Sequence, residues 1–152
     1  MCRESNFEIR KIQENDREKI SDLAMSFFRG EALAHPVPTS IINETLNSAI
    51  DGTKGLDGYT FTENGEVIGF AYVTEYFSTE RGGTCVQIED ICISEKCRGK
   101  GYGTEFFRWL EEQRPYAKRF RLEVTDVNIS AQKLYKRLGF SEVEYIQMAR
   151  EV

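Results

Sequence analysis

A run of three alternating glycines is the part of this chain whose composition points most directly to chemistry. It reads RGKGYG, from Arg98 to Gly103. Glycines leave backbone N–H groups uncovered, and a helix that starts among them adds partial positive charge, so such a run can bind a phosphate group. Lys96, Arg98 and Lys100 add cationic side chains. We interpret the run as a pyrophosphate site; the alternative is a solvated turn between a strand and a helix.

The two commonest nucleotide-binding motifs do not fit this run. A dinucleotide fingerprint, G-x-G-x-x-G, would need a glycine at position 104, where the chain has Thr104. A P-loop needs Ser or Thr after Gly-Lys, but Gly99-Lys100 is followed by Gly101. The run therefore predicts a phosphate site of another kind.

Two adjacent acids, Glu89 and Asp90, interrupt the otherwise apolar segment 84–93. Burying a carboxylate is costly unless it has a partner or a function, so the pair is a candidate for general-base catalysis. Simple alternation would put the two side chains on opposite faces of a strand, whereas a bulge would change the facing. The sequence leaves open which acid faces a cleft, and an ion pair with a neighbouring arginine is the alternative.

The composition excludes several classes of protein. With 152 residues, 40% of them hydrophobic, the chain predicts a single domain over residues 1–152. A net charge of −5 argues against nucleic acid as a partner. Without a bilayer-length apolar run or a secretory leader, we expect a cytoplasmic protein with no membrane partner. His35 is the only histidine and the four cysteines lack ligand spacing, so we expect reduced thiols and no metal.

Hydrophobic periodicity places these residues on alternating strands and helices. Asn64-Gly65 predicts a hairpin turn. Strands are expected over residues 7–12, 59–77 (around that turn), 84–93, 119–126 and 140–150. Helices are expected over residues 14–28, 35–50, 103–113 and 128–139. This order predicts an α/β (α+β) fold in which helices cover a mostly antiparallel sheet, and it puts the glycine run between a central strand and a helix.

Two blocks of the sequence resemble the GNAT superfamily of N-acetyltransferases. Arg98, Gly101 and Gly103 meet that superfamily's acyl-CoA signature, (Arg/Gln)-x-x-Gly-x-(Gly/Ala). The segment NISAQKLYKRLGF resembles its second block through Asn128, Ala131, Tyr135, Gly139 and Phe140. The blocks are in the superfamily's order, and the element order matches over nearly the whole chain. The segment IEDICISEKCRGKGYG is similar to the spermidine/spermine acetyltransferase branch in particular.

The resemblance implies a GNAT-like mixed sheet of six to seven strands, mostly antiparallel and splayed, with about four flanking helices. Acetyl-CoA, as cosubstrate, would lie between the strands at 84–93 and 119–126. The implied acetyl-CoA-binding residues are Ile91, Cys92 and Ile93 for the pantetheine arm, Arg98, Gly99, Lys100, Gly101, Tyr102, Gly103 and Thr104 for the pyrophosphate, and Asn128 and Ala131 on the other side.

The implied reaction is direct attack of a primary amine on the acetyl thioester. A base takes the amine proton, a strand amide near Cys92 stabilises the oxyanion, and an acid protonates the leaving thiolate. In the spermidine/spermine branch the glutamate of the Glu-Asp pair is the proposed base, acting through water, which favours Glu89 over Asp90. Tyr135 is the implied acid, although its place on an apolar helical stripe also suits a core aromatic.

The acceptor is the least determined part of this interpretation. Acids such as Glu75, Glu89 and Asp90 would suit a small cationic metabolite, held by the segments 31–40 and 76–83. Two alternatives stay open: a protein N-terminus or lysine as acceptor, or a non-catalytic acyl-CoA-binding sensor. Many relatives in the superfamily form dimers, so a homodimer is compatible with the resemblance.

Overall fold

The computed structural model describes residues 5–28 and 36–152, and these form one five-stranded sheet with four α-helices. The strands are β1 (Phe7–Lys11), β2 (Asp57–Glu63), β3 (Glu66–Ser78), β4 (Gly83–Ile93) and β5 (Arg119–Leu122). The helices are α1 (Arg17–Phe27), α2 (Thr39–Asp51), α3 (Tyr102–Gln113) and α4 (Ile129–Arg137), with short 3₁₀ turns at Glu14–Asp16 and Glu95–Cys97. In the described parts of the chain, no helix has both the length and the apolarity needed to cross a membrane.

The strands lie in the order in which they occur in the sequence. The pairs from β1 to β4 are antiparallel, and β5 runs parallel to β4. The predicted hairpin turn joins β2 to β3, where Asn64 and Gly65 both have positive φ angles, of 51° and 83°. The predicted mixed and mostly antiparallel sheet is confirmed.

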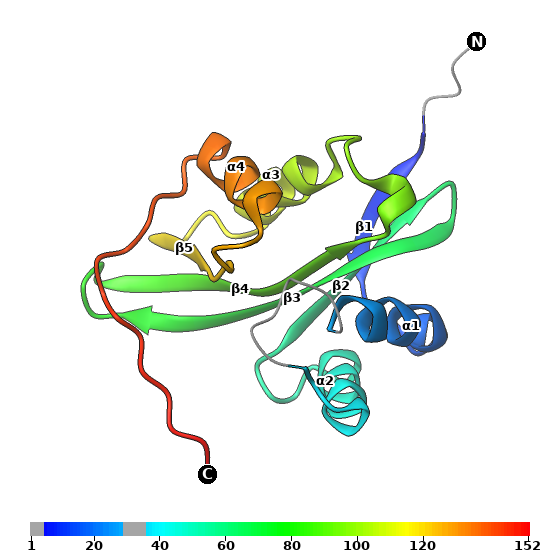
Figure 1. Cartoon of the computed structure of the whole chain (residues 1–152), viewed down its shortest axis with the longest axis horizontal. Coiled ribbons are helices and arrows are strands. Elements are labelled where there is room, and N and C mark those ends of the chain that lie inside the picture. Colours follow the sequence, from blue (N-terminus) through cyan, green and yellow to red (C-terminus); the bar gives the residue numbers. More distant parts are fainter. Residues whose placement is uncertain (1–4, 29–35) are drawn as a thin grey trace.

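Helices cover both faces of the sheet (Figure 1). On the α1/α2 face, Phe70, Tyr72 and Cys92 pack with the buried residues of the first two helices. On the α3/α4 face, Val73 and Ile88 pack with residues of α3 such as Phe106, Phe107 and Leu110. Side chains that alternate along β3 and β4 thus belong to two separate cores, and each position on these strands can be assigned to one face.

The sheet has five strands, so the expectation of six to seven is wrong. Residues 141–152 were predicted to contribute a strand but run without secondary structure past β5 and the β3–β4 hairpin (Figure 1). Among the described residues they make no backbone hydrogen bond. Their alternation explains this, because Glu142 and Glu144 share a side with Ile146 and Met148. Neither side of the segment is continuously apolar, and a strand needs one face that it can bury.

Candidate active site

The glycine run forms the turn between β4 and α3. Gly99 and Gly101 take left-handed φ angles of 77° and 86°, which residues with a Cβ atom rarely adopt, and α3 begins directly afterwards at Tyr102. Of the described residues, none supplies a hydrogen-bond acceptor to the backbone N–H groups from Gly99 to Thr104. Because these donors lie at the positive end of the helix dipole, the run has the geometry of an anion site.

Glu63, at the end of β2, holds the side chains of this run. Its carboxylate accepts hydrogen bonds from Lys100 Nζ at 2.8 Å and from the Tyr102 hydroxyl. Cys97 Sγ donates to it at 3.6 Å. The hydrogen bond from Lys100 is the largest of the effects that lower the pKa of Glu63. Since the charge of Lys100 is matched by this carboxylate, the run presents a ligand with backbone N–H groups more than with cationic side chains.

Two further contacts fix the ends of the run. Arg98 Nε donates to the backbone carbonyl of Ile93 at 2.9 Å, which ties the turn to the end of β4. The ring of Tyr102 stacks on Phe7 with the centroids 4.1 Å apart, and its hydroxyl lies 2.9 Å from Ser5 Oγ. The side chain of Tyr102 is therefore a structural anchor, and only its N–H belongs to the candidate anion site.

The second half of α4 lies close to the start of α3. A Cβ atom on Gly103 would lie 3.2 Å from Leu134, so glycine permits this approach of the two helices. Asn128 is the N-cap of α4, and its side-chain oxygen accepts the N–H of Ala131 at 3.2 Å. The predicted helix starting near Asn128 is confirmed, and the asparagine has a structural role as a cap.

β4 and β5 separate where the two acids occur. Their parallel pairing begins at Cys85 with Arg119 and ends at Ile88 with Leu122, while β4 continues to Ile93. From Glu89 onward β4 thus has no strand partner on this side among the described residues. The pairing thus stops where the resemblance implied a splay, because β5 itself ends at Leu122, and Ile91, Cys92 and Ile93 lie on the open edge of β4. Burial raises the pKa of the Cys92 thiol to about 12, so this side chain stays protonated.

A β-bulge in β4 brings the two acids to the same face. Tyr72 pairs with Asp90 and Val73 with Ile88, so Glu89 is the additional residue. The Thr74 hydroxyl donates to Glu89 at 2.6 Å. Because alternation puts both Tyr72 and Thr74 on the α1/α2 face, both carboxylates belong to that face. The sequence had left this facing open.

Asp90 is a half-buried acid without an ion pair among the described residues. Burial raises its pKa to about 6, and the neighbouring charge of Glu89 adds to the effect. No fully buried side-chain atom lacks a hydrogen-bond partner in the described structure, so the unpartnered carboxylate of Asp90 retains access to solvent. Glu89 is exposed. Asp90 thus lies beside a second, exposed carboxylate, and the two acids form a pair that is open to a ligand.

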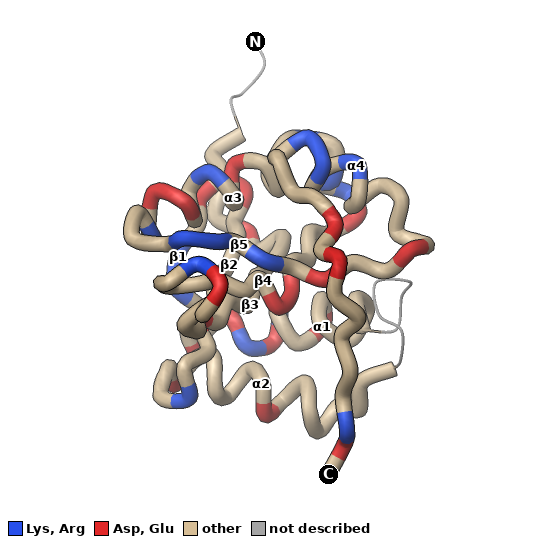
Figure 2. The backbone as a smooth tube through the Cα atoms, turned by 90° about the vertical axis from the view of Figure 1, so that its left-hand side faces the viewer, with Lys and Arg blue, Asp and Glu red and all other residues tan. Residues whose placement is uncertain are grey.

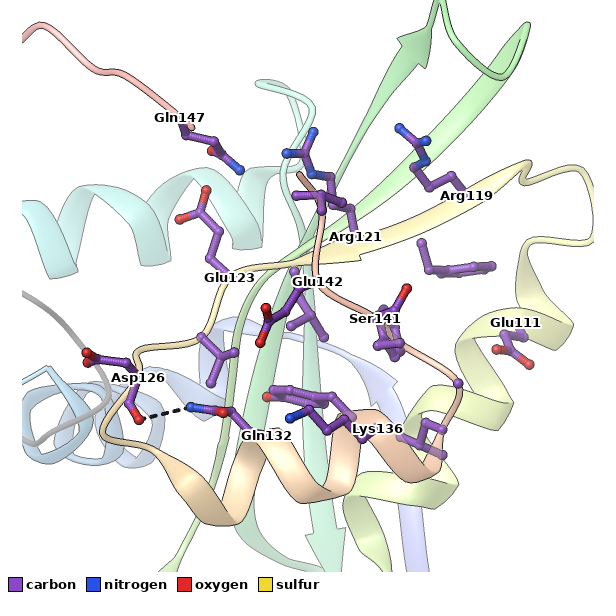
Figure 3. Close-up of a pocket in the computed structure, with 18 of the residues that line it drawn as sticks. Glu111, Arg119, Arg121, Glu123, Asp126, Gln132, Lys136, Ser141, Glu142 and Gln147 are labelled. Atoms are coloured by element: carbon purple, nitrogen blue, oxygen red, sulfur yellow. Dashed lines mark hydrogen bonds between the residues drawn. The ribbon is translucent and has the colours of Figure 1, made fainter. Parts of the chain in front are cut away.

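Tyr135 lies on α4 between the core and a hollow. Its ring contacts Phe107 and Phe140 edge to face, with centroids 5.8 and 6.0 Å away. It also lines a hollow of about 1000 Å³ between β5, α4 and the C-terminal segment (Figure 3). Burial raises the pKa of its hydroxyl. The ring of Tyr135 thus packs as a core aromatic while the residue also borders a cavity, and its role as the acid stays a prediction.

Glu75 does not join Glu89 and Asp90, contrary to the expectation of an acidic acceptor site that includes it. Its carboxylate accepts hydrogen bonds from Arg114 Nε at 2.8 Å and from the Tyr116 hydroxyl at 2.7 Å. The Arg114 guanidinium, 8% exposed, also bonds Asp57 and the hydroxyl of Tyr59. Because Glu75 follows Thr74 in the strand, it points to the α3/α4 side, where it is a structural partner of the arginine.

Of the two segments expected to hold the acceptor, 31–40 and 76–83, only the second lies entirely within the described residues. Residues 31–35, with His35, lie outside the described residues. The 76–83 segment is half strand and half turn, because β3 extends to Ser78 and β4 starts at Gly83. Tyr76 and Phe77 are 42% and 68% exposed there. The hairpin therefore offers two exposed aromatic side chains beside the sheet.

Comparison with known families decides what this arrangement belongs to. The model of the acetyltransferase (GNAT) family matches residues 17–140. The chain belongs to the GNAT acetyltransferase family. The match covers the glycine run, the splayed strands and α4, and it does not single out the spermidine/spermine branch. A comparison with curated protein sequences finds no match.

Solved GNAT structures share the fold at low sequence identity. The aminoglycoside N-acetyltransferase AAC(6')-Iy in complex with CoA has a TM-score of 0.79 and 18% identity, covering 99% of this chain and 98% of that one. The same enzyme with a bisubstrate analogue, CoA-S-monomethyl-acetylneamine, gives 0.78 and 18%, covering 97% and 99%. The ribosomal-protein-alanine N-acetyltransferase from Brucella melitensis biovar Abortus 2308 gives 0.78 and 17%, covering 96% and 100%.

Two contacts between distant residues of the site have no local signal in the sequence. Glu63 is separated from Lys100 by 37 positions, and only the sheet brings them together. Arg121 lies beside Tyr76, 45 positions earlier in the chain, because β5 pairs with β4 and β4 pairs with β3. The alternation in RFRL, residues 119–122, could have indicated two arginines on one face of a strand.

Proposed function

We propose that the protein transfers the acetyl group of acetyl-CoA to a primary amine by direct attack. The observation that carries this proposal is the set of free N–H groups from Gly99 to Thr104, at the start of α3 and next to the open edge of β4. Diphosphate oxygens accept such N–H groups, and the helix dipole favours their charge. A plain solvated turn would not require two left-handed glycines in a run whose side chains Glu63 holds in place.

The neighbouring elements support the remaining contacts with acetyl-CoA. The backbone of Ile91, Cys92 and Ile93 is free of a strand partner on the β5 side, so it can pair with the amide groups of the pantetheine arm. An N–H group of this edge, near Cys92, can also stabilise the oxyanion of the tetrahedral intermediate. Asn128 and Ala131 border the opposite side, at the start of α4.

The carboxylate pair Glu89 and Asp90 supplies the base in this proposal. An amine must lose a proton to become a nucleophile, and a base with a pKa near 6 is ionised at neutral pH while still able to accept that proton. Glu89 is the exposed member that can reach the proton, directly or through a water molecule, and Asp90 shares the charge. Tyr135 returns a proton to the leaving thiolate, because a phenol and a thiol have comparable pKa values.

The acceptor class is a matter for experiment. The names of AAC(6')-Iy, an aminoglycoside N-acetyltransferase, and of the Brucella ribosomal-protein-alanine N-acetyltransferase indicate that this fold serves different amine acceptors in other proteins. The decisive assay follows CoA thiol release from acetyl-CoA with polyamines, aminoglycosides, amino acids and short peptides. Acceptor-dependent thiol release, with the acetylated amine identified by mass spectrometry, supports the proposal. Tight acetyl-CoA binding with no turnover on any amine would instead indicate the sensor function.

A further inference from the structure

Two arginines, Arg119 and Arg121, project from the same side of β5 (Figure 3). The residues that alternate with them, Phe120 and Leu122, pack into the α3/α4 core. The arginines therefore lie on the α1/α2 side, the side of Glu89 and Asp90. Blue segments along β5 in Figure 2 show this concentration of positive charge on a protein whose net charge is −5.

Neither arginine has a carboxylate of its own within hydrogen-bond distance in the described part of the chain. The approach of Arg119 to Glu80 is 3.8 Å. Arg121 lies 3.5 Å from the Tyr76 hydroxyl and donates to the side-chain oxygen of Gln147 at 2.8 Å. By contrast, Arg114 bonds the carboxylates of Glu75 and Asp57 at 2.8 and 3.0 Å. Two like charges two residues apart repel each other, so their arrangement favours an anion between them.

The arginines also border the hollow that Tyr135, the proposed acid, lines. Arg119, Arg121 and Gln147 line the same hollow of about 1000 Å³ as Tyr135 (Figure 3). Glu123, directly after β5, accepts the side-chain N–H of Gln147 at 2.9 Å when the amide is oriented so that both of its groups have a partner. Gln147 thus bridges Glu123 and Arg121 Nη2, while Nη1 has only the long contact with Tyr76 among the described residues.

The charges on this face are separated along the strands. Arg121 is the partner of Gln87, three residues before Asp90 in β4. With a rise of about 3.3 Å per residue and about 4.8 Å between strands, the Cα atoms of Asp90 and Arg121 lie about 11 Å apart. Arg121 reaches away from Asp90, toward Tyr76. The face therefore has a negative end at the bulge and a positive end near the hairpin.

We propose that the acceptor is an amino acid or short peptide whose carboxylate binds Arg121 and Arg119 while its amine lies at Glu89 and Asp90. The inference rests on the proposed amine acetylation and names the acceptor's second charged group. Because of the distance between the two ends, amine and carboxylate are several bonds apart in a good acceptor, as in an ω-amino acid or a dipeptide. A purely cationic polyamine matches only the negative end.

A matched pair of acceptors tests this. The compounds 6-aminohexanoate and 6-aminohexanamide have similar amines and lengths, and differ in the charge of the far end. We expect kcat/KM to be at least about tenfold higher for the acid, the effect of one good charged hydrogen-bond pair. The double variant Arg119→Gln, Arg121→Gln should bring this ratio close to one. Arg81→Gln, an exposed arginine in the β3–β4 turn, should keep it.

Other outcomes separate the possible failures. If amines are acetylated but acid and amide react equally, or the ratio survives in the double variant, the carboxylate site is refuted and the acetyltransferase activity stands. If no amine is acetylated, both proposals fail. A preference for 5-aminopentyl phosphate over 6-aminohexanoate would assign the arginines to a phosphate and overturn the carboxylate. Calorimetry with the two N-acetylated products and CoA gives the same comparison without turnover, and circular dichroism verifies that the variants fold.

Discussion

Replacing Gly101 by alanine separates the backbone's role in stability from its role in binding. Gly101 has φ 86° and ψ 8° as the N-cap of α3, and a Cβ there meets nothing within 4 Å. The expected cost to folding is therefore strain alone, about 1–2 kcal/mol for a left-handed residue with a Cβ. In a chain of this size that lowers Tm by about 2–8 °C.

Binding of CoA should suffer more than stability. Relief of the strain rotates the peptides on both sides of position 101 and turns their N–H groups away from the site. Losing one N–H bond to a charged oxygen costs about 1.5–3 kcal/mol, which corresponds to about 10- to 100-fold weaker binding. Calorimetric titration with CoA measures the affinity, and urea unfolding followed by the fluorescence of Trp109, the single tryptophan, measures the stability.

Gly52 offers a matched control. It is the C-cap of α2, with φ 71° and ψ 7°, and a Cβ there also meets nothing within 4 Å. Gly52→Ala should lose the same stability as Gly101→Ala and keep the CoA affinity of the parent protein. Equal CoA affinities in the two variants would refute the assignment of the glycine run to the diphosphate.

Three further predictions concern single side chains. Asp90→Asn should abolish the rise of kcat/KM through pH 6. The pKa of Asp90 in the folded protein, about 6, lies above its value in the unfolded chain, so ionisation of this carboxyl costs stability above that pH. The variant should therefore be about 1–3 kcal/mol more stable than the parent protein in urea at pH 8. A retained limb near pH 6 would exclude Asp90 from the base. Tyr135→Phe should leave CoA affinity nearly unchanged in calorimetry and lower kcat; an unchanged kcat removes the hydroxyl from the mechanism. Arg114→Met should cost about 2–3 kcal/mol in urea unfolding, a value reduced from that of a fully buried pair because its acidic partners are about one-third exposed. The exposed pair of Arg17 with Glu14 gives the control, since Arg17→Met should leave the stability nearly unchanged. Equal losses in both variants would contradict the reasoning.

Features determined by neighbouring residues were predictable from the sequence. Asn64-Gly65 specifies its own turn because both residues tolerate positive φ, whatever the strands on either side pack against. The spacing of Phe106, Phe107 and Leu110 likewise determines which side of α3 is buried. The glycine run could be placed between a strand and a helix for the same reason, since its conformation depends on Gly99 and Gly101 themselves.

Features determined by pairing between distant segments were not predictable in this way. The bulge at Glu89 exists because Tyr72 pairs with Asp90 and Val73 with Ile88, a register that no local pattern specifies. Glu75 has the same charge as Glu89 but points to the other face, where it forms an ion pair with Arg114. The alternation after residue 140 is typical of a strand, but neither side of the segment is continuously apolar, so no strand forms.

The bonds from Lys100 and Tyr102 to Glu63 have a consequence for the kinetics of binding. They hold the turn before α3 in place before any ligand arrives, so the conformational entropy of this turn is lost during folding and not during association. CoA then encounters a site that already has its final shape. Its observed association rate should rise linearly with concentration in a single phase, as for a rigid receptor, without the plateau that a slow ordering step would impose.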